Sequence, residues 1–192
     1  DLDHTLLHSD MSVFMRPYFA LLGRRISDLL PMEVMRSHLD RGVEAMLRNN
    51  GGPKTNAEAF MEVFFDGLDV PKDVLMARFK AFYEEDFDQL RTYTQSKPEA
   101  RPLVQDVFRM GNRVVIATQP MFPLVAVRSR LEWAGVADFP YELITSYEVM
   151  HACKPYPAYY QEIADYLGLP PEACLMAGDS IQMDMVAGEI GM

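Results

Sequence analysis

Two carboxylates and a hydroxyl lie within the segment Asp1-Leu2-Asp3-His4-Thr5, directly before the apolar pair Leu6-Leu7. Side chains of an extended segment alternate between two faces, so Asp1 and Asp3 can both point toward one site. Two carboxyl groups this close can divide the work of nucleophile and acid–base catalyst. When such a pair stands alone, a solvated acidic turn is the better explanation, because Asp-x-Asp is common in turns.

Three later segments add polar residues at points where an apolar run ends or a helix is expected to begin. They are Thr118-Gln119 after the apolar run Val114–Ala117, Lys154 before Pro155, and Gly178-Asp179-Ser180 with Asp184 further on. Clustered carboxylate oxygens without histidine or cysteine neighbours select a hard cation, and Mg²⁺ is the natural one beside a phosphate. The combined set therefore favours a catalytic site over four unrelated turns.

The order Asp-x-Asp-x-Thr, strand-Thr, Lys-Pro and Gly-Asp-Ser with a later Asp resembles the haloacid dehalogenase-like (HAD) hydrolase superfamily. The phosphatase branch with a helical C1-type cap, similar to phosphoglycolate phosphatases, fits best, and the resemblance to the superfamily covers nearly the whole chain. This resemblance implies an α/β fold: a Rossmann-like three-layer, parallel-sheet core with an inserted all-helical cap domain. His4 and Gln119 depart from the family pattern, which most often has glycine and asparagine there, but neither change removes a reacting group.

The resemblance also implies a role for each motif residue. Asp1 would be the nucleophile that forms an aspartyl-phosphate, and Asp3 would protonate the leaving oxygen and then activate water. Thr118 and Gln119 would bind the substrate's phosphoryl group. Lys154 would steady the nucleophile and balance negative charge. The alternatives are a strand-end hydroxyl bonded to backbone for Thr118 and a solvated surface lysine for Lys154.

The metal expected from the same resemblance is Mg²⁺. Asp1 and Asp179 would bind it through their carboxylates, and Asp3 through its backbone carbonyl. Asp184 would support the site through water or as an orienting group. A structural helix cap is the alternative for Asp184.

Periodicity divides the chain into a helical segment and an alternating one. We expect an all-helical cap of about four helices over 11–95, with capping residues at Thr55–Glu58, and a catalytic core over 1–10 and 96–192. In the core the pattern predicts helices over 101–110, 124–134 and 158–167, and strands over 114–117, 141–145 and 174–177. Helices that alternate with strands indicate a parallel sheet. The Met- and Phe-rich stripes of the cap are predicted to be bundle core in preference to a ligand pocket.

The chain begins at Asp1 and ends at Met192, just after the fourth motif. In the family a buried strand precedes the first aspartate, so we expect the catalytic core to be truncated at both ends. The formal charge of −10 argues against nucleic acid or an anionic membrane as the main partner. No apolar run approaches the roughly 20 residues of a membrane span. A small phosphorylated metabolite is the expected partner, and the cytoplasm the expected location.

Several functions compete on these residues. The leading hypothesis is a Mg²⁺-dependent phosphatase that hydrolyses a small phosphomonoester. A phosphomutase would use the same chemistry but shield the aspartyl-phosphate from water. A dehalogenase has less use for an acid at Asp3, because a halide leaves without a proton. A non-catalytic phosphate-binding regulatory protein has no need of that acid either.

Overall fold

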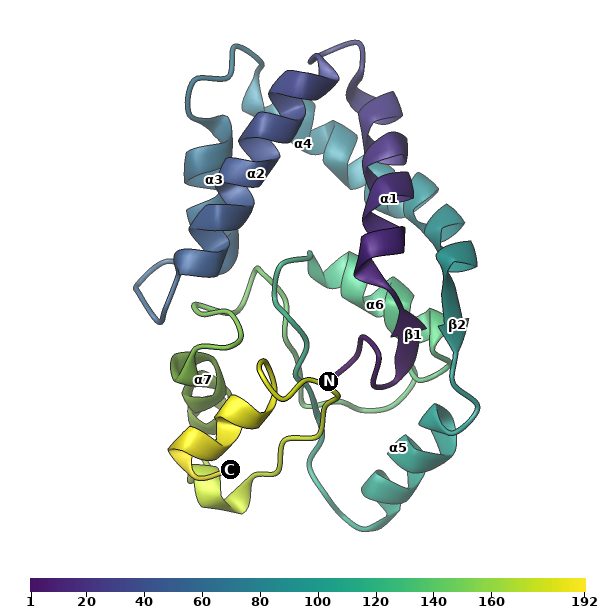
Figure 1. Cartoon of the computed structure of the whole chain (residues 1–192), viewed down its shortest axis with the longest axis vertical. Helices are drawn as coiled ribbons and strands as arrows, with labels where there is room; N and C mark the ends of the chain where they lie inside the picture. The colour runs from purple at the N-terminus through teal and green to yellow at the C-terminus, as the bar shows by residue number, and fades with distance from the viewer.

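The protein is described by a computed structural model of residues 1–192, in which a helical layer stands over a mixed α/β part (Figure 1). The helical layer holds α1 (Met11–Ile26), α2 (Met32–Arg48), α3 (Asn56–Phe65) and α4 (Lys72–Ala81), followed by the helical turns η1 (Phe82–Asp86) and η2 (Phe87–Tyr93). Two of the helices begin at side-chain caps. The Asp10 carboxylate accepts a hydrogen bond from Ser12 N at 2.8 Å before α1, and Thr55 and Glu58 form the predicted capping box before α3.

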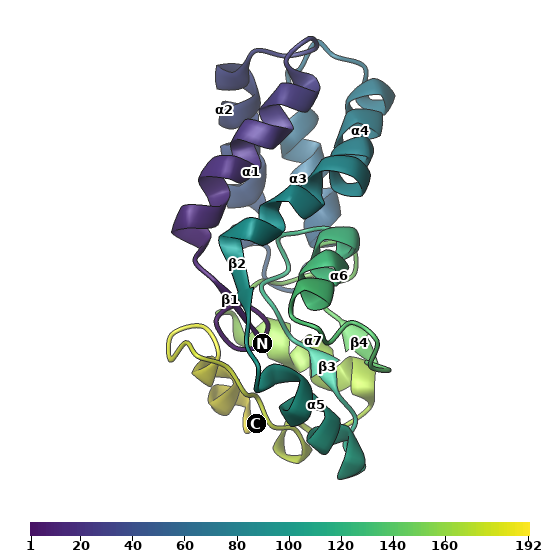
Figure 2. The ribbon, with the colours of Figure 1, turned by 90° about the vertical axis from the view of Figure 1, so that its right-hand side faces the viewer.

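The chain enters and leaves this layer through two short strands that lie side by side. Strand β1 (Leu7–Ser9) pairs antiparallel with β2 (Thr94–Ser96), with Leu7 opposite Ser96 and Ser9 opposite Thr94. Figure 2 shows both strands rising from the α/β part toward the helices. This pair therefore joins the first motif directly to the base of the helical layer.

The rest of the chain alternates helices with a small parallel sheet. Its elements are α5 (Ala100–Arg109), β3 (Val115–Ile116), α6 (Leu124–Trp133), β4 (Leu143–Ile144), α7 (Pro157–Leu167), and the 3₁₀ turns η3 (Pro171–Ala173) and η4 (Met185–Ile190). β3 and β4 are parallel neighbours, as the helix–strand alternation predicts. Gly168 ends α7 with φ +63°, a left-handed conformation that costs glycine little.

The expected third strand over 174–177 is wrong, because this segment pairs with no other strand. Leu175, which a sheet would bury, is 90% exposed. A run of four apolar residues favours extended backbone, but a ladder also needs a neighbouring strand in register. The sheet content is thus two separate two-stranded pairs, and the mixed α/β class holds while the three-layer arrangement is not seen in detail.

One apolar cluster runs from the first motif through the helical layer. Leu2, Leu6 and Leu7 belong to it together with Phe14 of α1 and Trp133 of α6. Trp133 stacks on Phe87 with ring centroids 5.3 Å apart. The acidic segment at the chain start is thereby anchored by Leu2 within it and by Leu6 and Leu7 after it. No helix is both long enough and apolar enough to span a bilayer.

Candidate active site

Lys154 lies at the centre of the gathered motif residues and is only 3% exposed. Its Nζ donates to Asp1 Oδ1 at 2.9 Å and to Asp184 Oδ1 at 2.5 Å. Thr5 Oγ1 donates to the other Asp1 oxygen at 2.9 Å, which fixes the carboxylate at both ends. Burial lowers the pKa of the Lys154 ammonium, and the hydrogen bond to Asp184 opposes that shift. A solvated surface lysine, the alternative for Lys154, is excluded by this burial.

Three carboxylates converge beside this lysine. Asp1, Asp179 and Asp184 each offer an oxygen within 4.8 Å of the other two. Carboxylate oxygens are the hard donors that Mg²⁺ prefers, so these three residues would be able to hold such an ion. Asp179 is exposed and free to bind, whereas Asp184 is buried and already accepts hydrogen bonds. The donor set suits a hard cation, and the outer position expected of Asp184 stays a prediction.

The Asp184 carboxylate also shapes the preceding loop. Ser180 N donates to Asp184 Oδ2 at 3.0 Å, which closes the turn that contains Asp179. A Cβ added at Gly178 would collide with this same carboxylate, so only glycine allows so close an approach. Asp184 precedes η4 without a side-chain cap hydrogen bond, and the helix-cap alternative is therefore wrong.

Thr118 is buried at the end of β3, and its backbone is held by two residues that the sequence patterns did not single out. Thr118 N donates to Thr145 Oγ1 at 3.0 Å, and Tyr159 OH donates to Thr118 O at 2.8 Å. The Thr118 hydroxyl makes no hydrogen bond within the protein, so the alternative of a hydroxyl bonded to backbone is wrong. Its predicted bond to a phosphoryl oxygen stays a prediction.

Gln119 contacts the backbone of the central lysine. Its Oε1 accepts from Lys154 N at 2.9 Å, and its Nε2 donates to Lys154 O at 3.1 Å. This reciprocal pair fixes the loop that presents the Lys154 ammonium. Gln119 also lines a large cavity. The side chain therefore positions Lys154, and the substrate contact predicted for Gln119 stays a prediction.

Asp3 forms its ion pair with a buried arginine and not with Lys154. Arg130 NH2 donates to Asp3 Oδ2 in a close ion pair, and Ser9 Oγ donates to Oδ1 at 2.6 Å. Arg130 is 2% exposed, and its guanidinium lies over the Phe122 ring at 5.2 Å. Sequence reasoning missed Arg130 because its partner lies 127 positions away. The metal contact expected of the Asp3 backbone carbonyl stays a prediction.

His4, at the turn between the two aspartates and β1, has φ +58°. This left-handed region favours glycine, the residue expected there from the family resemblance. His4 N donates to Leu7 O at 2.7 Å, closing the turn. The departure at His4 therefore changes backbone strain and leaves the carboxylates in place.

Comparisons with known proteins agree with this geometry. A family model described as haloacid dehalogenase-like hydrolase matches residues 1–190. Phosphatase MT3486 of Mycobacterium tuberculosis (strain CDC 1551 / Oshkosh) is 34% identical over 87 residues, which are 45% of this chain and 39% of that protein. This match spans about two fifths of the relative.

A solved structure shares the fold. The crystal structure of an HAD phosphatase from Thermococcus onnurineus superposes with a TM-score of 0.53 at 20% identity, covering 100% of this chain and 81% of that one. The fold, the ordered motifs and the match over almost every residue lead to one conclusion. The chain belongs to the haloacid dehalogenase-like hydrolase family.

Proposed function

We propose that the protein is a Mg²⁺-dependent phosphatase that hydrolyses a phosphomonoester through an aspartyl-phosphate on Asp1. The observation that supports this most strongly is the buried Lys154 ammonium held between Asp1 and Asp184. It fixes one carboxylate oxygen of Asp1 and supplies positive charge where a phosphate would bind. Mg²⁺, bound by Asp1 and Asp179 and supported by Asp184, would neutralise further phosphate charge and orient the group for in-line attack.

The reaction would proceed in two steps, transfer of the phosphoryl group to Asp1 and hydrolysis of the aspartyl-phosphate. An Asp1 oxygen bonds to phosphorus while the bond from phosphorus to the alcohol oxygen breaks, and the leaving oxygen takes a proton from Asp3. Water then attacks phosphorus, gives its proton to Asp3, and releases phosphate as the Asp1 carboxylate re-forms. Thr118 and Lys154 would hold phosphoryl oxygens in both steps.

Asp3 must change a partner to act as this acid and base. Both of its oxygens accept hydrogen bonds, one from Ser9 and one from Arg130. We infer that the leaving oxygen replaces one of these two donors when substrate binds. A Rossmann-like three-layer core over 1–10 and 96–192, with 11–95 as its cap domain, is the arrangement proposed to bring Asp3 and the substrate together.

The experiment that tests this function is phosphate release from p-nitrophenyl phosphate by the purified protein. We expect turnover with millimolar Mg²⁺ and none with a chelator, with recovery when Mg²⁺ is added back. Turnover that is equal in chelator would contradict the metal-dependent mechanism. Complete inactivity under every metal condition would contradict the phosphatase assignment itself.

A further inference from the structure

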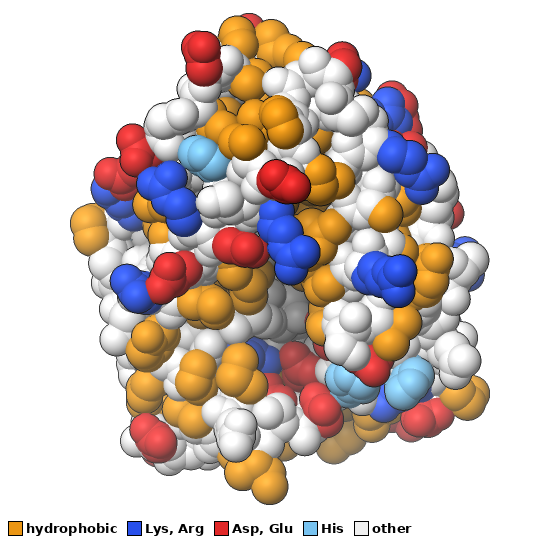
Figure 3. All heavy atoms as spheres, turned by 45° about the horizontal axis from the view of Figure 1, so that its top comes forward, with side chains coloured by type: hydrophobic (Ala, Val, Ile, Leu, Met, Phe, Trp, Pro, Cys, Tyr) orange, Lys and Arg blue, Asp and Glu red, His pale blue; other side chains and the backbone are white.

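A cavity adjoins the proposed catalytic residues on their helical side. Its volume is about 560 Å³, within the range of sites that enclose drug-sized ligands. Asp3 and Gln119 lie in its wall, beside residues from α1, α2, α3, α4 and the loop before α6. Figure 3 shows the surface hollowed between the helical layer and the rest of the molecule. The cavity thus opens where the leaving group of a bound phosphomonoester would extend.

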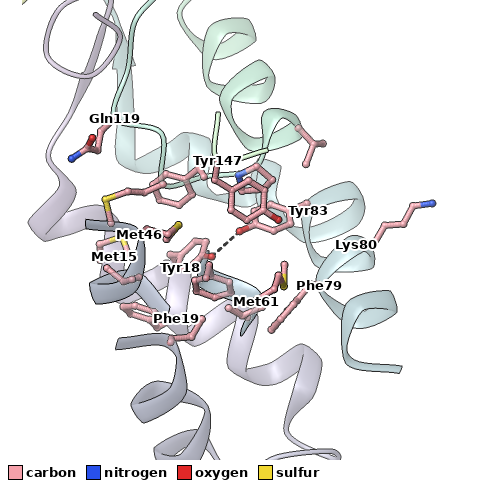
Figure 4. Close-up of a pocket in the computed structure, with 18 of the residues that line it drawn as sticks. Met15, Tyr18, Phe19, Met46, Met61, Phe79, Lys80, Tyr83, Gln119 and Tyr147 are labelled. Atoms are coloured by element: carbon pink, nitrogen blue, oxygen red, sulfur yellow. Dashed lines mark hydrogen bonds between the residues drawn. The ribbon is translucent and has the colours of Figure 1, made fainter. Parts of the chain in front are cut away.

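The wall of this cavity is apolar. Seventeen of its 23 lining residues are hydrophobic, so a polar leaving group would lose its water contacts there and gain few hydrogen-bond partners in return. Met15, Met46 and Met61 line it from three different helices, and Figure 4 shows them around the Tyr18–Tyr83 pair. Methionine side chains are flexible and adapt to irregular apolar shapes. The methionine stripes predicted to be bundle core therefore also form a wall beside the site.

Two tyrosines in the cavity wall, Tyr18 and Tyr83, are neutral and form a hydrogen bond with each other. The Tyr18 and Tyr83 hydroxyls lie 2.9 Å apart in a hydrogen bond (Figure 4). Burial raises the pKa of Tyr18 to about 12, so the hydroxyl stays protonated at neutral pH. This pair adds a hydrogen-bonded polar point to a mostly apolar surface, and no charge.

Positive charge is nearly absent from the wall. Lys80 is the one basic residue among those that line the cavity, against the acidic Asp3, Asp40 and Glu84. The Lys80 side chain is 74% exposed, points outward in Figure 4, and pairs with Glu84 at 3.8 Å. A second anionic group on the substrate, such as a carboxylate or another phosphate, would find no free cation here and would meet acidic neighbours.

We propose that the substrate is the phosphate monoester of an apolar alcohol, whose hydrocarbon chain or ring system fills this cavity while the phosphate binds at Asp1 and Lys154. This inference rests on the proposed function and narrows its substrate class. It separates the protein from phosphatases of small anionic metabolites such as phosphoglycolate, which the resemblance alone would favour.

The test is a series of n-alkyl phosphates, from ethyl to octyl, measured by phosphate release with Mg²⁺ below the concentrations at which they form micelles. We expect kcat/KM to rise by at least about tenfold from ethyl to octyl phosphate, because each buried methylene contributes to binding. Glycerol phosphate and phosphoglycolate should be poorer substrates than octyl phosphate. Equal rates along the series, or a preference for phosphoglycolate, would overturn the inference and leave the phosphatase function standing.

A variant of the cavity wall gives a second arm. Met61→Gln keeps the side-chain length but places an amide against the hydrocarbon, so kcat/KM for octyl phosphate should fall by about tenfold. Activity on ethyl phosphate should change little. Met110→Gln is the matched control, because Met110 is 77% exposed and lies outside the cavity. An equal loss on both substrates in Met61→Gln, with native melting, would contradict a leaving-group role for the cavity.

Binding without turnover separates this inference from the proposed function. Octylphosphonate and ethylphosphonate cannot be hydrolysed, and their dissociation constants can be measured by calorimetry. We expect octylphosphonate to bind at least about tenfold more tightly. If no ester is hydrolysed yet octylphosphonate binds tightly, the phosphatase proposal fails and the apolar site stands. If the two phosphonates bind equally, the apolar site fails.

Discussion

The ionic cluster around Lys154 and the neighbouring cavity are built in opposite ways. In the cluster, the buried charges of Lys154, Asp1 and Asp184 are paired with one another at hydrogen-bond distances. In the cavity, most lining residues are apolar and the one basic side chain points outward. The residues of the cluster come from loops of the α/β part, and those of the cavity mainly from four helices and a loop. We infer that the ionic cluster carries out the reaction and that the cavity selects the leaving group. Substitutions in the cluster should therefore change turnover, and substitutions in the cavity should change which esters are preferred.

The largest expected effect separates catalysis from binding. Asp1→Asn is nearly isosteric but removes the nucleophile, so kcat should fall by roughly a thousandfold or more. Octylphosphonate binding should change far less, because the cavity is untouched. Calorimetry and phosphate release on the same preparation would measure both. An Asp1→Asn protein that keeps a tenth of wild-type turnover would remove Asp1 from the nucleophile's role.

The features that the sequence could predict are mostly short-range ones. Short-range patterns were sufficient for the Thr55 capping box and the Gly168 helix end, and for the parallel pair of β3 and β4. The proximity of Asp1 and Lys154 was expected from the order of the motifs, although neither residue lies at the end of a strand in the structure. Their catalytic roles stay predictions.

Long-range contacts could not be predicted. Arg130 lies on a helix whose sequence contains no feature that links it to Asp3, and only the fold brings the two together. The Thr145 and Tyr159 bonds to Thr118 are of the same kind. The sequence does not distinguish a stripe of methionines that fills a bundle core from one that lines a cavity. The absent strand over 174–177 shows that an apolar run does not by itself indicate which strand, if any, it will pair with.

A second prediction concerns stability in the ionic cluster. Lys154→Met leaves the 2%-exposed Asp184 carboxylate without its cation, and the free energy of unfolding should fall by about 3–5 kcal/mol in chelator. Met61→Leu, a change of similar volume in the cavity wall, should cost less than about 1.5 kcal/mol. Urea unfolding of both variants would measure the contrast. A similar loss of unfolding free energy in the two variants would mean that pairing the buried charges contributes no more to stability than packing in the cavity wall.

A third, smaller effect concerns the metal. Mg²⁺ at a hundred times its dissociation constant should add about 2.7 kcal/mol and raise the melting temperature by several degrees. Asp179→Ala should erase most of this response and slightly raise stability in chelator, because it removes one of three repelling carboxylates. Asp66→Ala, an exposed carboxylate of the helical layer, is the control and should keep the full response. An equal Mg²⁺ shift in Asp179→Ala and wild type would exclude Asp179 from the metal site.

The smallest expected effect lies in the turn between the cluster and β1. His4→Gly relieves a left-handed backbone at φ +58° and should raise the free energy of unfolding by up to about 1 kcal/mol. His8→Gly, within β1, should instead lower it by roughly 0.5–1 kcal/mol. Chemical denaturation would measure both signs. A loss of stability in His4→Gly would show that the histidine ring, and not the backbone, matters at this position.

The central claim is that Asp1 is the residue that receives the phosphoryl group. The most direct measurement is to quench the protein in acid during turnover of octyl phosphate, reduce it with borohydride, and locate homoserine by peptide mass spectrometry. The account predicts homoserine at position 1, and none in protein reduced without substrate. Phosphate release in a burst, with homoserine at another aspartate or at none, would contradict it.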